Sequence, residues 1–220
     1  MPVLTKNNIL DRIRAGGLRF DPPLDGFQIQ PHAVDLRLGF AFRLPKTWEL
    51  TENGREALNI DYLGTRKGDY FEEIQLVPGQ TFELLPSEFV IVTTLEEIQM
   101  PLDLMTVLYP RTSFNRRGLA VDLSGIIDAG YRGHLAIPVR NNTATQVIKM
   151  YPGERMCQVV FQTLSEPVTE ADALRHGLSK AKYHHYGDTE VQNAQADRAV
   201  EMKFVRSGQL KELKKQYPAV

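Results

Sequence analysis

The chain has 220 residues, an apolar content of 42% and a formal net charge of −1, the composition of an ordinary globular protein. Its balanced charge excludes the basic excess of a nucleic-acid-binding protein, so any anion site has to be local. No apolar run reaches the roughly 20 residues of a membrane span. Cys157 is the only cysteine, which excludes an internal disulfide and a cysteine-rich zinc site and favours a reducing cytoplasm.

The first residues predict a helix rather than a signal peptide, because they contain no long apolar run. Thr5 is a suitable N-cap, and Ile9, Leu10 and Ile13 form an apolar stripe at helical spacing. Gly16 and the glycine after it are expected to end this helix. The next segment, residues 18–31, is rich in proline and glycine and is expected to form turns.

From His32 onward the apolar residues alternate with a period of two, which is typical of β-strands. The same period recurs in short runs separated by turn signals such as Val77-Pro-Gly79; the runs lie at residues 34–44, 82–85, 89–92, 135–139 and 156–161. Many short strands at such spacing predict an all-β core, a distorted β-barrel or a jelly roll. The sequence shows neither a βαβα alternation nor a phosphate-loop glycine signature.

Composition predicts three parts of the chain. Residues 1–27 form the N-terminal helix and turn segment, and residues 28–167 form the β core. A charged, less periodic insertion at about residues 46–70 carries the only tryptophan, Trp48. Residues 168–220 form a C-terminal lid and helical extension, with a helix or a helix pair broken near Ser207-Gly208.

The most informative segment runs from Tyr109 to Asn141. Its first part holds basic and hydroxyl side chains, namely Arg111, Thr112, Ser113, Arg116 and Arg117. Guanidinium groups pair bidentately with phosphate oxygens, so this cluster predicts phosphate binding, although a solvated basic turn is the usual fate of such residues. If the segment is extended, Arg117 faces away from its neighbour, since adjacent residues alternate sides. Farther on, Asp128 lies between apolar residues and glycines, which suits water activation or sugar binding.

Several blocks in the same order resemble the dCTP deaminase/dUTPase superfamily over roughly residues 28–165. The blocks are Ile29–Gly39, Pro86–Glu96 with Met100–Asp103, Arg111–Gly118, Gly125–Gly133 and Pro152–Gln158. The third block is similar to the deaminase branch, and the last two are similar to dUTPase motifs. The resemblance implies a dUTPase-like β core and a homotrimer with sites at subunit interfaces.

The resemblance also implies roles for single residues. Asp128 would orient and activate the attacking water, and Arg116 would act with it. Tyr131 would pack on the deoxyribose and leave no room for a 2′-hydroxyl, although a core aromatic is the plainer interpretation. The triphosphate would be held by Arg111, Thr112, Ser113 and Gln158, and covered by Lys182 and Tyr183 in a lid.

Magnesium is implied as the metal, chelated by the substrate phosphates. Asp35 is a candidate for holding a water of the Mg²⁺ shell, in keeping with the reluctance of this ion to dehydrate. A purely structural carboxylate is the alternative for Asp35.

One departure bears on the reaction. Deaminases of this superfamily carry a glutamate ten residues after the aspartate, and that position is Pro138 here, flanked by the aliphatic Ile137 and Val139. The sequence therefore predicts dUTP hydrolysis to dUMP and pyrophosphate. The alternatives are a dCTP deaminase that forms dUTP or dUMP, favoured by the overall deaminase-like sequence, and a non-catalytic regulatory protein that binds deoxynucleoside triphosphates. No residue in the sequence determines which nucleotide base the protein prefers.

Overall fold

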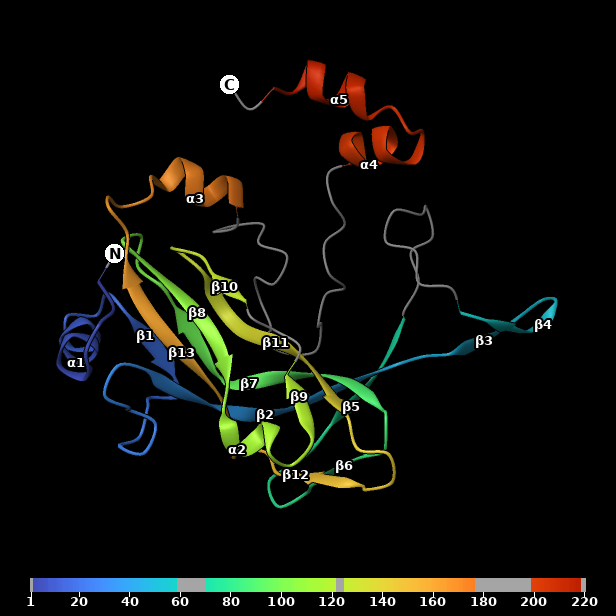
Figure 1. Ribbon diagram of the computed structural model, residues 1–220, viewed down its shortest axis with the longest axis horizontal. Coiled ribbons are helices and arrows are strands. Elements are labelled where there is room, and N and C mark those ends of the chain that lie inside the picture. Colours follow the sequence, from blue (N-terminus) through green and yellow to red (C-terminus); the bar gives the residue numbers. More distant parts are fainter. Residues whose placement is uncertain (1, 59–69, 122–124, 177–198, 219–220) are drawn as a thin grey trace.

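The chain is described by a computed structural model that places residues 2–58, 70–121, 125–176 and 199–218 (Figure 1). It begins with helix α1 (Lys6–Arg14). The Asn8 side chain accepts hydrogen bonds from the Thr5 backbone N–H at 3.3 Å and from the Thr5 hydroxyl at 2.8 Å, and so caps the first turn. Ile9 is buried, and Gly16 ends the helix with a φ of 72°. The predicted N-terminal helix is confirmed.

An antiparallel sheet of nine strands forms the body of the molecule and curls into an open half-barrel (Figure 1). Its path runs β10-β8-β13-β2-β7-β11-β9, and β1 and β5 pair with β7 and β2 off this path. The strands of this sheet are β1 (Arg19–Asp21), β2 (Val34–Pro45), β5 (Phe71–Gln75), β7 (Phe89–Gln99), β8 (Leu104–Pro110), β9 (Leu119–Val121), β10 (Ile126–Ile127), β11 (Arg132–Asn141) and β13 (Arg155–Thr163). Two further strands, β6 (Phe82–Leu84) and β12 (Ile148–Met150), pair with each other. The predicted all-β core is confirmed.

Strand β2 holds the two halves of the sheet together. Its first residues pair with β13, and from Leu38 onward it pairs with β7. The register shifts after Leu38, where Gly39 lies so close to β7 that an added Cβ would meet the Thr93 carbonyl oxygen at 2.9 Å. Only glycine fits this approach, so the residue that joins the two halves has no side chain.

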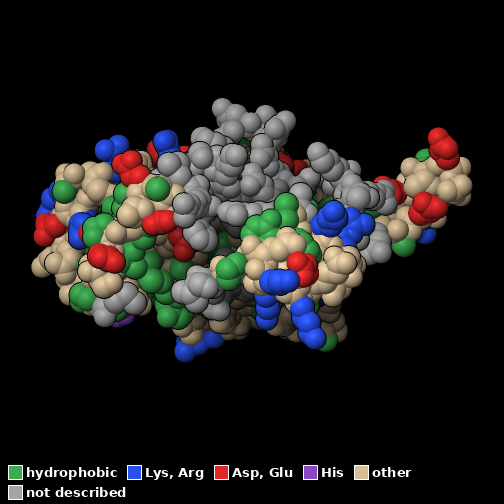
Figure 2. Space-filling view, turned by 90° about the horizontal axis from the view of Figure 1, so that it is seen from above, with side chains coloured by type: hydrophobic (Ala, Val, Ile, Leu, Met, Phe, Trp, Pro, Cys, Tyr) green, Lys and Arg blue, Asp and Glu red, His purple; other side chains and the backbone are tan. Residues whose placement is uncertain are grey.

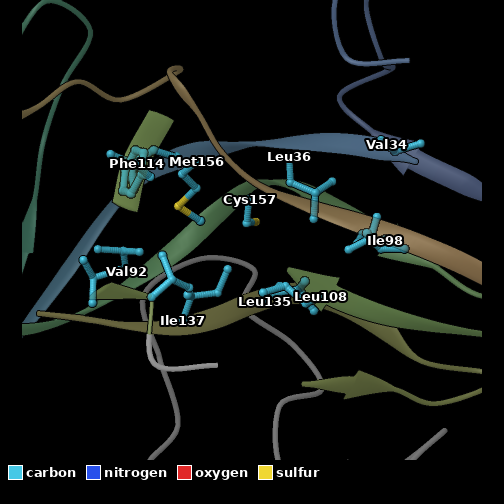
Figure 3. Packing of buried hydrophobic residues seen from close by; sticks show 14 of the residues in the cluster. Val34, Leu36, Val92, Ile98, Leu108, Phe114, Leu135, Ile137, Met156 and Cys157 are labelled. Atoms are coloured by element: carbon cyan, nitrogen blue, oxygen red, sulfur yellow. The ribbon is translucent and has the colours of Figure 1, made fainter. Parts of the chain in front are cut away.

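The core fills the concave side of the half-barrel (Figure 3). Alternate side chains of β2, β7, β8, β11 and β13 point into it; among them are Leu36, Ile98, Leu108, Ile137 and Cys157. Phe42 stacks on Phe82 with ring centroids 4.4 Å apart. The thiol of Cys157 is fully buried, which confirms its interpretation as a small apolar core residue.

The segment predicted as turns before residue 32 contains a strand, so that expectation was incomplete. Strand β1 pairs with the end of β7, with Phe20 opposite Ile98. Leu18 is fully buried, and the Phe20 ring meets Phe161 edge to face with centroids 6.4 Å apart. The three residues of β1 are too few to show a period, and burial of these two side chains fixes them in the sheet.

The predicted insertion contains a β-hairpin, β3 (Trp48–Thr51) and β4 (Gly54–Ala57), that projects from the body (Figures 1 and 2). Trp48 is stacked beneath the guanidinium of Arg55 at 5.0 Å. Beyond the core lie α3 (Glu170–His176), α4 (Ala199–Arg206) and α5 (Leu210–Gln216). The break between α4 and α5 falls at residues 207–209, which confirms the predicted helix pair. Among the described residues, no helix is long and apolar enough to cross a membrane.

Candidate functional site

Asp35 is the centre of one group of predicted site residues. It lies in the first part of β2, between the buried Val34 and Leu36, and its relative exposure is 2%. Gln158 of β13 stands directly opposite it in the strand register and is half-buried. The structure thus brings together two of the predicted residues from blocks that are far apart in the sequence.

Two arginines neutralise the buried Asp35 carboxylate. Its Oδ2 lies 3.2 Å from Nε of Arg111 and 3.1 Å from Nη1 of Arg155. Arg111 also donates through Nη1 to the backbone carbonyl of Arg155 at 3.1 Å. Burial raises the pKa of Asp35, and the charges of Arg111 and Arg155 act against that rise. Asp35 therefore fixes the position of Arg111, one of the predicted phosphate ligands.

The basic and hydroxyl cluster after Arg111 is a short helix, α2 (Thr112–Asn115). Phe114 is its single buried residue and anchors it to the core, whereas Thr112, Ser113 and Arg116 are exposed. The extended conformation considered for this segment is therefore wrong. Arg117 instead lies over the Phe114 ring at 4.7 Å and pairs with Glu154 at 2.7 Å.

Gly118 ends this segment with a φ of 91°, a conformation that favours glycine. A Cβ there would also meet Cγ2 of Thr143 at 2.5 Å. The turn at Gly118 leads the chain from α2 directly into β9.

Asp128 lies in the turn between β10 and β11 and is exposed. The Tyr131 N–H donates to the Asp128 carbonyl at 3.1 Å, and Gly130 adopts a φ of 79°. The Tyr131 hydroxyl donates to the His134 carbonyl at 2.7 Å, while its ring packs against the core cluster. These contacts hold the backbone and the ring, and leave the Asp128 carboxylate at the surface.

Within one chain the structure does not bring Asp128 and the arginine cluster together. Ile127 lies opposite Thr106 near the start of β8, and Arg111 follows the last residue of that strand. A strand rises about 3.3 Å per residue, so these positions are separated by roughly 16 Å along β8. One chain therefore keeps the two predicted half-sites apart: Arg111, at which phosphate binding is predicted and which we call the phosphate end, and Asp128, which we call the sugar end after its predicted contact.

Pro138 occupies the position at which a glutamate is expected from the resemblance to the deaminases of the superfamily. It lies in β11 opposite Ile91, between the buried Ile137 and Val139. Pro138 itself is half-buried and has no group that can exchange a proton. The predicted lid residues, Lys182 and Tyr183, lie outside the described residues.

Sequence reasoning missed a buried carboxylate, Glu96, that is linked to Asp35 through Gln28. Glu96 in β7 is 1% exposed and accepts hydrogen bonds from the Gln28 side chain at 2.7 Å and from the Arg37 backbone N–H at 2.9 Å. Gln28 also donates to the Asp35 carbonyl at 2.9 Å. Burial raises the pKa of Glu96, and these two hydrogen bonds oppose the rise. A charged residue inside an apolar strand run was the signal that could have identified it.

The described side chains offer no site for a directly bound metal, so Mg²⁺ would have to be held through the phosphates of the substrate. Among the residues the structure describes, no group of three or more His, Cys, Asp or Glu side chains could hold a metal ion. The Asp35 carboxylate is engaged by two guanidinium groups, so it does not fit a direct Mg²⁺ ligand. Its contact with a water bound to Mg²⁺ stays a prediction.

Comparison with known proteins places these observations in a family. The family model described as dCTP deaminase-like matches residues 3–164. A protein of Methanobrevibacter smithii named "dCTP deaminase, dUMP-forming" is 30% identical over 172 residues, which cover 76% of this chain and 83% of that relative. A protein of Halorubrum lacusprofundi named "dCTP deaminase" is 32% identical over 179 residues, 80% of this chain and 84% of the relative.

A solved structure shows the same fold. The 2′-deoxycytidine 5′-triphosphate deaminase of Agrobacterium tumefaciens aligns with a TM-score of 0.56 and 24% identity. The alignment covers 79% of this chain and 52% of the other chain.

Proposed function

The chain belongs to the dCTP deaminase-like family, and on that premise we propose that it hydrolyses dUTP to dUMP and pyrophosphate. The observation that carries the proposal is the pairing of a retained Asp128 with Pro138 at the deaminase position. An exposed carboxylate in a fixed turn can accept a proton from water, whereas a proline cannot.

The name of the first relative describes a conversion that contains both candidate reactions. A "dUMP-forming" dCTP deaminase turns a triphosphate with an amino group into a monophosphate without one. Such a conversion contains two reactions, loss of the 4-amino group and loss of two phosphoryl groups. This chain keeps the residues that suit the second reaction and lacks a proton-exchanging side chain at the position that suits the first.

The proposed step is a displacement at the α-phosphorus. The water oxygen forms a bond to that phosphorus, its proton passes to the Asp128 carboxylate, and the bond to the bridging oxygen breaks to release pyrophosphate. Donors at Arg111, Thr112, Ser113, Arg116 and Gln158 would hold the phosphates, because such reactions depend mostly on positioning and charge neutralisation. The substrate is written as the magnesium complex of dUTP, and Tyr131 would exclude a 2′-hydroxyl.

The two half-sites of one chain support an assembled site. Asp128 and Arg111 lie at opposite ends of β8, roughly 16 Å apart along the strand at about 3.3 Å per residue. A homotrimer in which the sugar end of one chain faces the phosphate end of the next would unite them, since a head-to-tail interface closes into a ring of three when each copy is rotated by a third of a turn.

Deamination of dCTP is the second candidate, and the names of the curated relatives favour it. It needs a group that takes a proton from water and delivers it to the ring or to the leaving amine. At the expected position the described structure offers Pro138 between two aliphatic side chains. A non-catalytic nucleotide-binding protein is the third, and the retained Asp128 argues against it.

Product analysis tests these candidates against each other. The purified protein is incubated with dUTP and with the four standard deoxynucleoside triphosphates, dCTP among them, and nucleotides, pyrophosphate and ammonia are quantified. We expect dUMP and pyrophosphate from dUTP and no ammonia from dCTP. The Asp128→Asn variant, purified in parallel, controls for contaminating hydrolases.

Two results would change the assignment. Robust ammonia release from dCTP would show that another residue supplies the base and would place deamination first. Nucleotide binding with no product from any of these substrates would favour the regulatory alternative. The Pro138→Glu variant is expected to stay inactive as a deaminase, because its surroundings are not built to orient the new carboxylate.

A further inference from the structure

Arg155 is a residue to which neither the family resemblance nor the relatives assign a role. It begins β13 and shares the Asp35 carboxylate with Arg111. The two guanidinium groups contact the same oxygen, so they are immediate neighbours. Two positive charges around one negative charge leave a local net charge of about +1, which an anion would offset.

The Arg155 side chain is held on one edge only. Its Nη1 donates to the Phe27 carbonyl at 2.6 Å and to Oδ2 of Asp35 at 3.1 Å. The Phe27 carbonyl also accepts from the Gln30 side chain at 2.9 Å, so this acceptor is itself fixed. One nitrogen of the guanidinium thus anchors the group to the protein and sets the direction of the others.

The other edges of the two arginines have donors to spare. Within the described residues, Nε and Nη2 of Arg155 and Nη2 of Arg111 make no hydrogen bond or ion pair. None of these three nitrogen atoms is among the buried atoms that lack a partner, so they reach solvent. The side chains of Arg111 and Arg155 are 27% and 29% exposed.

We propose that Arg155 and Arg111 form a paired binding site for the polyphosphate chain of the nucleotide, with Asp35 as the residue that positions both. Paired planar guanidinium groups match the oxygens of adjacent phosphoryl groups, and a fixed orientation lowers the entropic cost of binding. Gln158, opposite Asp35 in the register, adds an amide beside the pair. The inference rests on the proposed function and extends it, because it names one more residue that binds the same substrate.

Binding of inorganic triphosphate, dUTP and dUMP, measured by calorimetry, tests the pair without any need for turnover. In the Arg155→Gln variant we expect the affinities for dUTP and inorganic triphosphate to fall roughly tenfold or more, since a charge-assisted hydrogen bond is lost. The affinity for dUMP should change much less. Arg140→Gln is the matched control, because Arg140 is exposed on β11 and its contacts among the described residues are with the Ser87 carbonyl and the Phe89 ring.

Unchanged triphosphate affinity in Arg155→Gln would overturn the proposal, and so would an equal loss for dUTP and dUMP, which indicates a structural role. If the glutamine variant does not fold, Arg155→Lys keeps the charge and is expected to bind triphosphate with intermediate affinity. A second readout uses the native protein: phenylglyoxal should modify Arg155, and inorganic triphosphate should protect it while dUMP should not. Equal modification with and without triphosphate contradicts the pair.

The outcomes separate this inference from the proposed function. A protein that binds triphosphate through Arg155 but makes no dUMP keeps the pair and loses the hydrolase assignment. A protein that makes dUMP with the same KM in Arg155→Gln keeps the assignment and loses the pair.

Discussion

The two ends of β8 carry the two halves of the proposed site, and they are held in opposite ways. At the phosphate end, Asp35 is buried and bonds Arg111 and Arg155. At the sugar end, the Asp128 side chain is exposed and makes no hydrogen bond or ion pair with any described residue. There the backbone and the Tyr131 ring are fixed instead.

Because of this difference, the fixed phosphate end suits substrate binding and the exposed Asp128 suits proton transfer. A cluster of fixed charges binds polyphosphate without rearrangement, because its donors are already oriented. A carboxylate that must take a proton from water works best when no protein donor occupies its oxygens. One chain thus holds its guanidinium donors in fixed positions at the phosphate end, whereas the Asp128 side chain at the sugar end has no partner among the described residues.

Asp128→Asn gives the largest effect. An amide cannot take up a proton, and general-base assistance is worth about 10²- to 10⁴-fold, so dUTP turnover should fall by that factor. Affinity for dUTP should persist, because the phosphate end is untouched. Steady-state hydrolysis and calorimetric binding measure the two separately. Wild-type turnover in the pure variant would remove Asp128 from the mechanism.

Tyr131→Ala should have a smaller effect, on selectivity. A ring packed on deoxyribose leaves a 2′-hydroxyl clashing or without a partner, at a cost of roughly 1–3 kcal/mol. The wild type should therefore prefer dUTP over UTP, and the alanine variant should narrow that gap. Tyr131→Phe is the control, since it keeps the ring and removes the hydroxyl that donates to the His134 carbonyl. Equal affinity of the wild type for both nucleotides contradicts this role.

Glu96 should make stability depend on pH beside the phosphate end. Because burial raises its pKa, the folded chain keeps this proton at a pH where the unfolded chain has lost it. The stabilisation is complete below the ordinary carboxyl pKa and is lost as pH rises through the raised pKa. Denaturant unfolding at several pH values should show that decline, and Glu96→Gln should flatten it. Glu83→Gln is the control, because the Glu83 side chain on β6 is 58% exposed, and it should keep the wild-type slope. Equal slopes for the Glu96 and Glu83 variants would reject the assignment.

Cys157 should show the smallest response. Burial raises the pKa of its thiol far above the ordinary value, and the nearby Glu96 and Asp35 carboxylates add to the shift. A thiol reagent should leave the native protein unlabelled and should react with one equivalent after unfolding. Rapid labelling of the native chain would show that the core beneath Asp35 opens.

The sequence allowed the β core to be predicted, because a period of two is a local signal. Its motif blocks also named Asp35, Arg111 and Gln158 as site residues, and the structure brings these three side chains together. It did not reveal strand β1, whose place depends on burial of Leu18 and Phe20 against distant strands. Arg155 lies inside the Pro152–Gln158 block, but no local signal indicates its role, because Arg155 and Arg111 become neighbours only when β13 and β8 pair. The helical form of residues 112–115 was also hidden, as a single buried aromatic anchors it.

Mixed oligomers test most directly that the site is assembled from two chains. Asp128→Asn disables only the sugar end and Arg116→Gln only the phosphate end, so each variant alone should be nearly inactive. Co-refolded in equal amounts, they should regain about a quarter of wild-type dUTP hydrolysis, because random pairing restores that share of interfaces. Activity that stays at the average of the two variants would contradict a shared site and would require Asp128 and Arg116 to act within one chain.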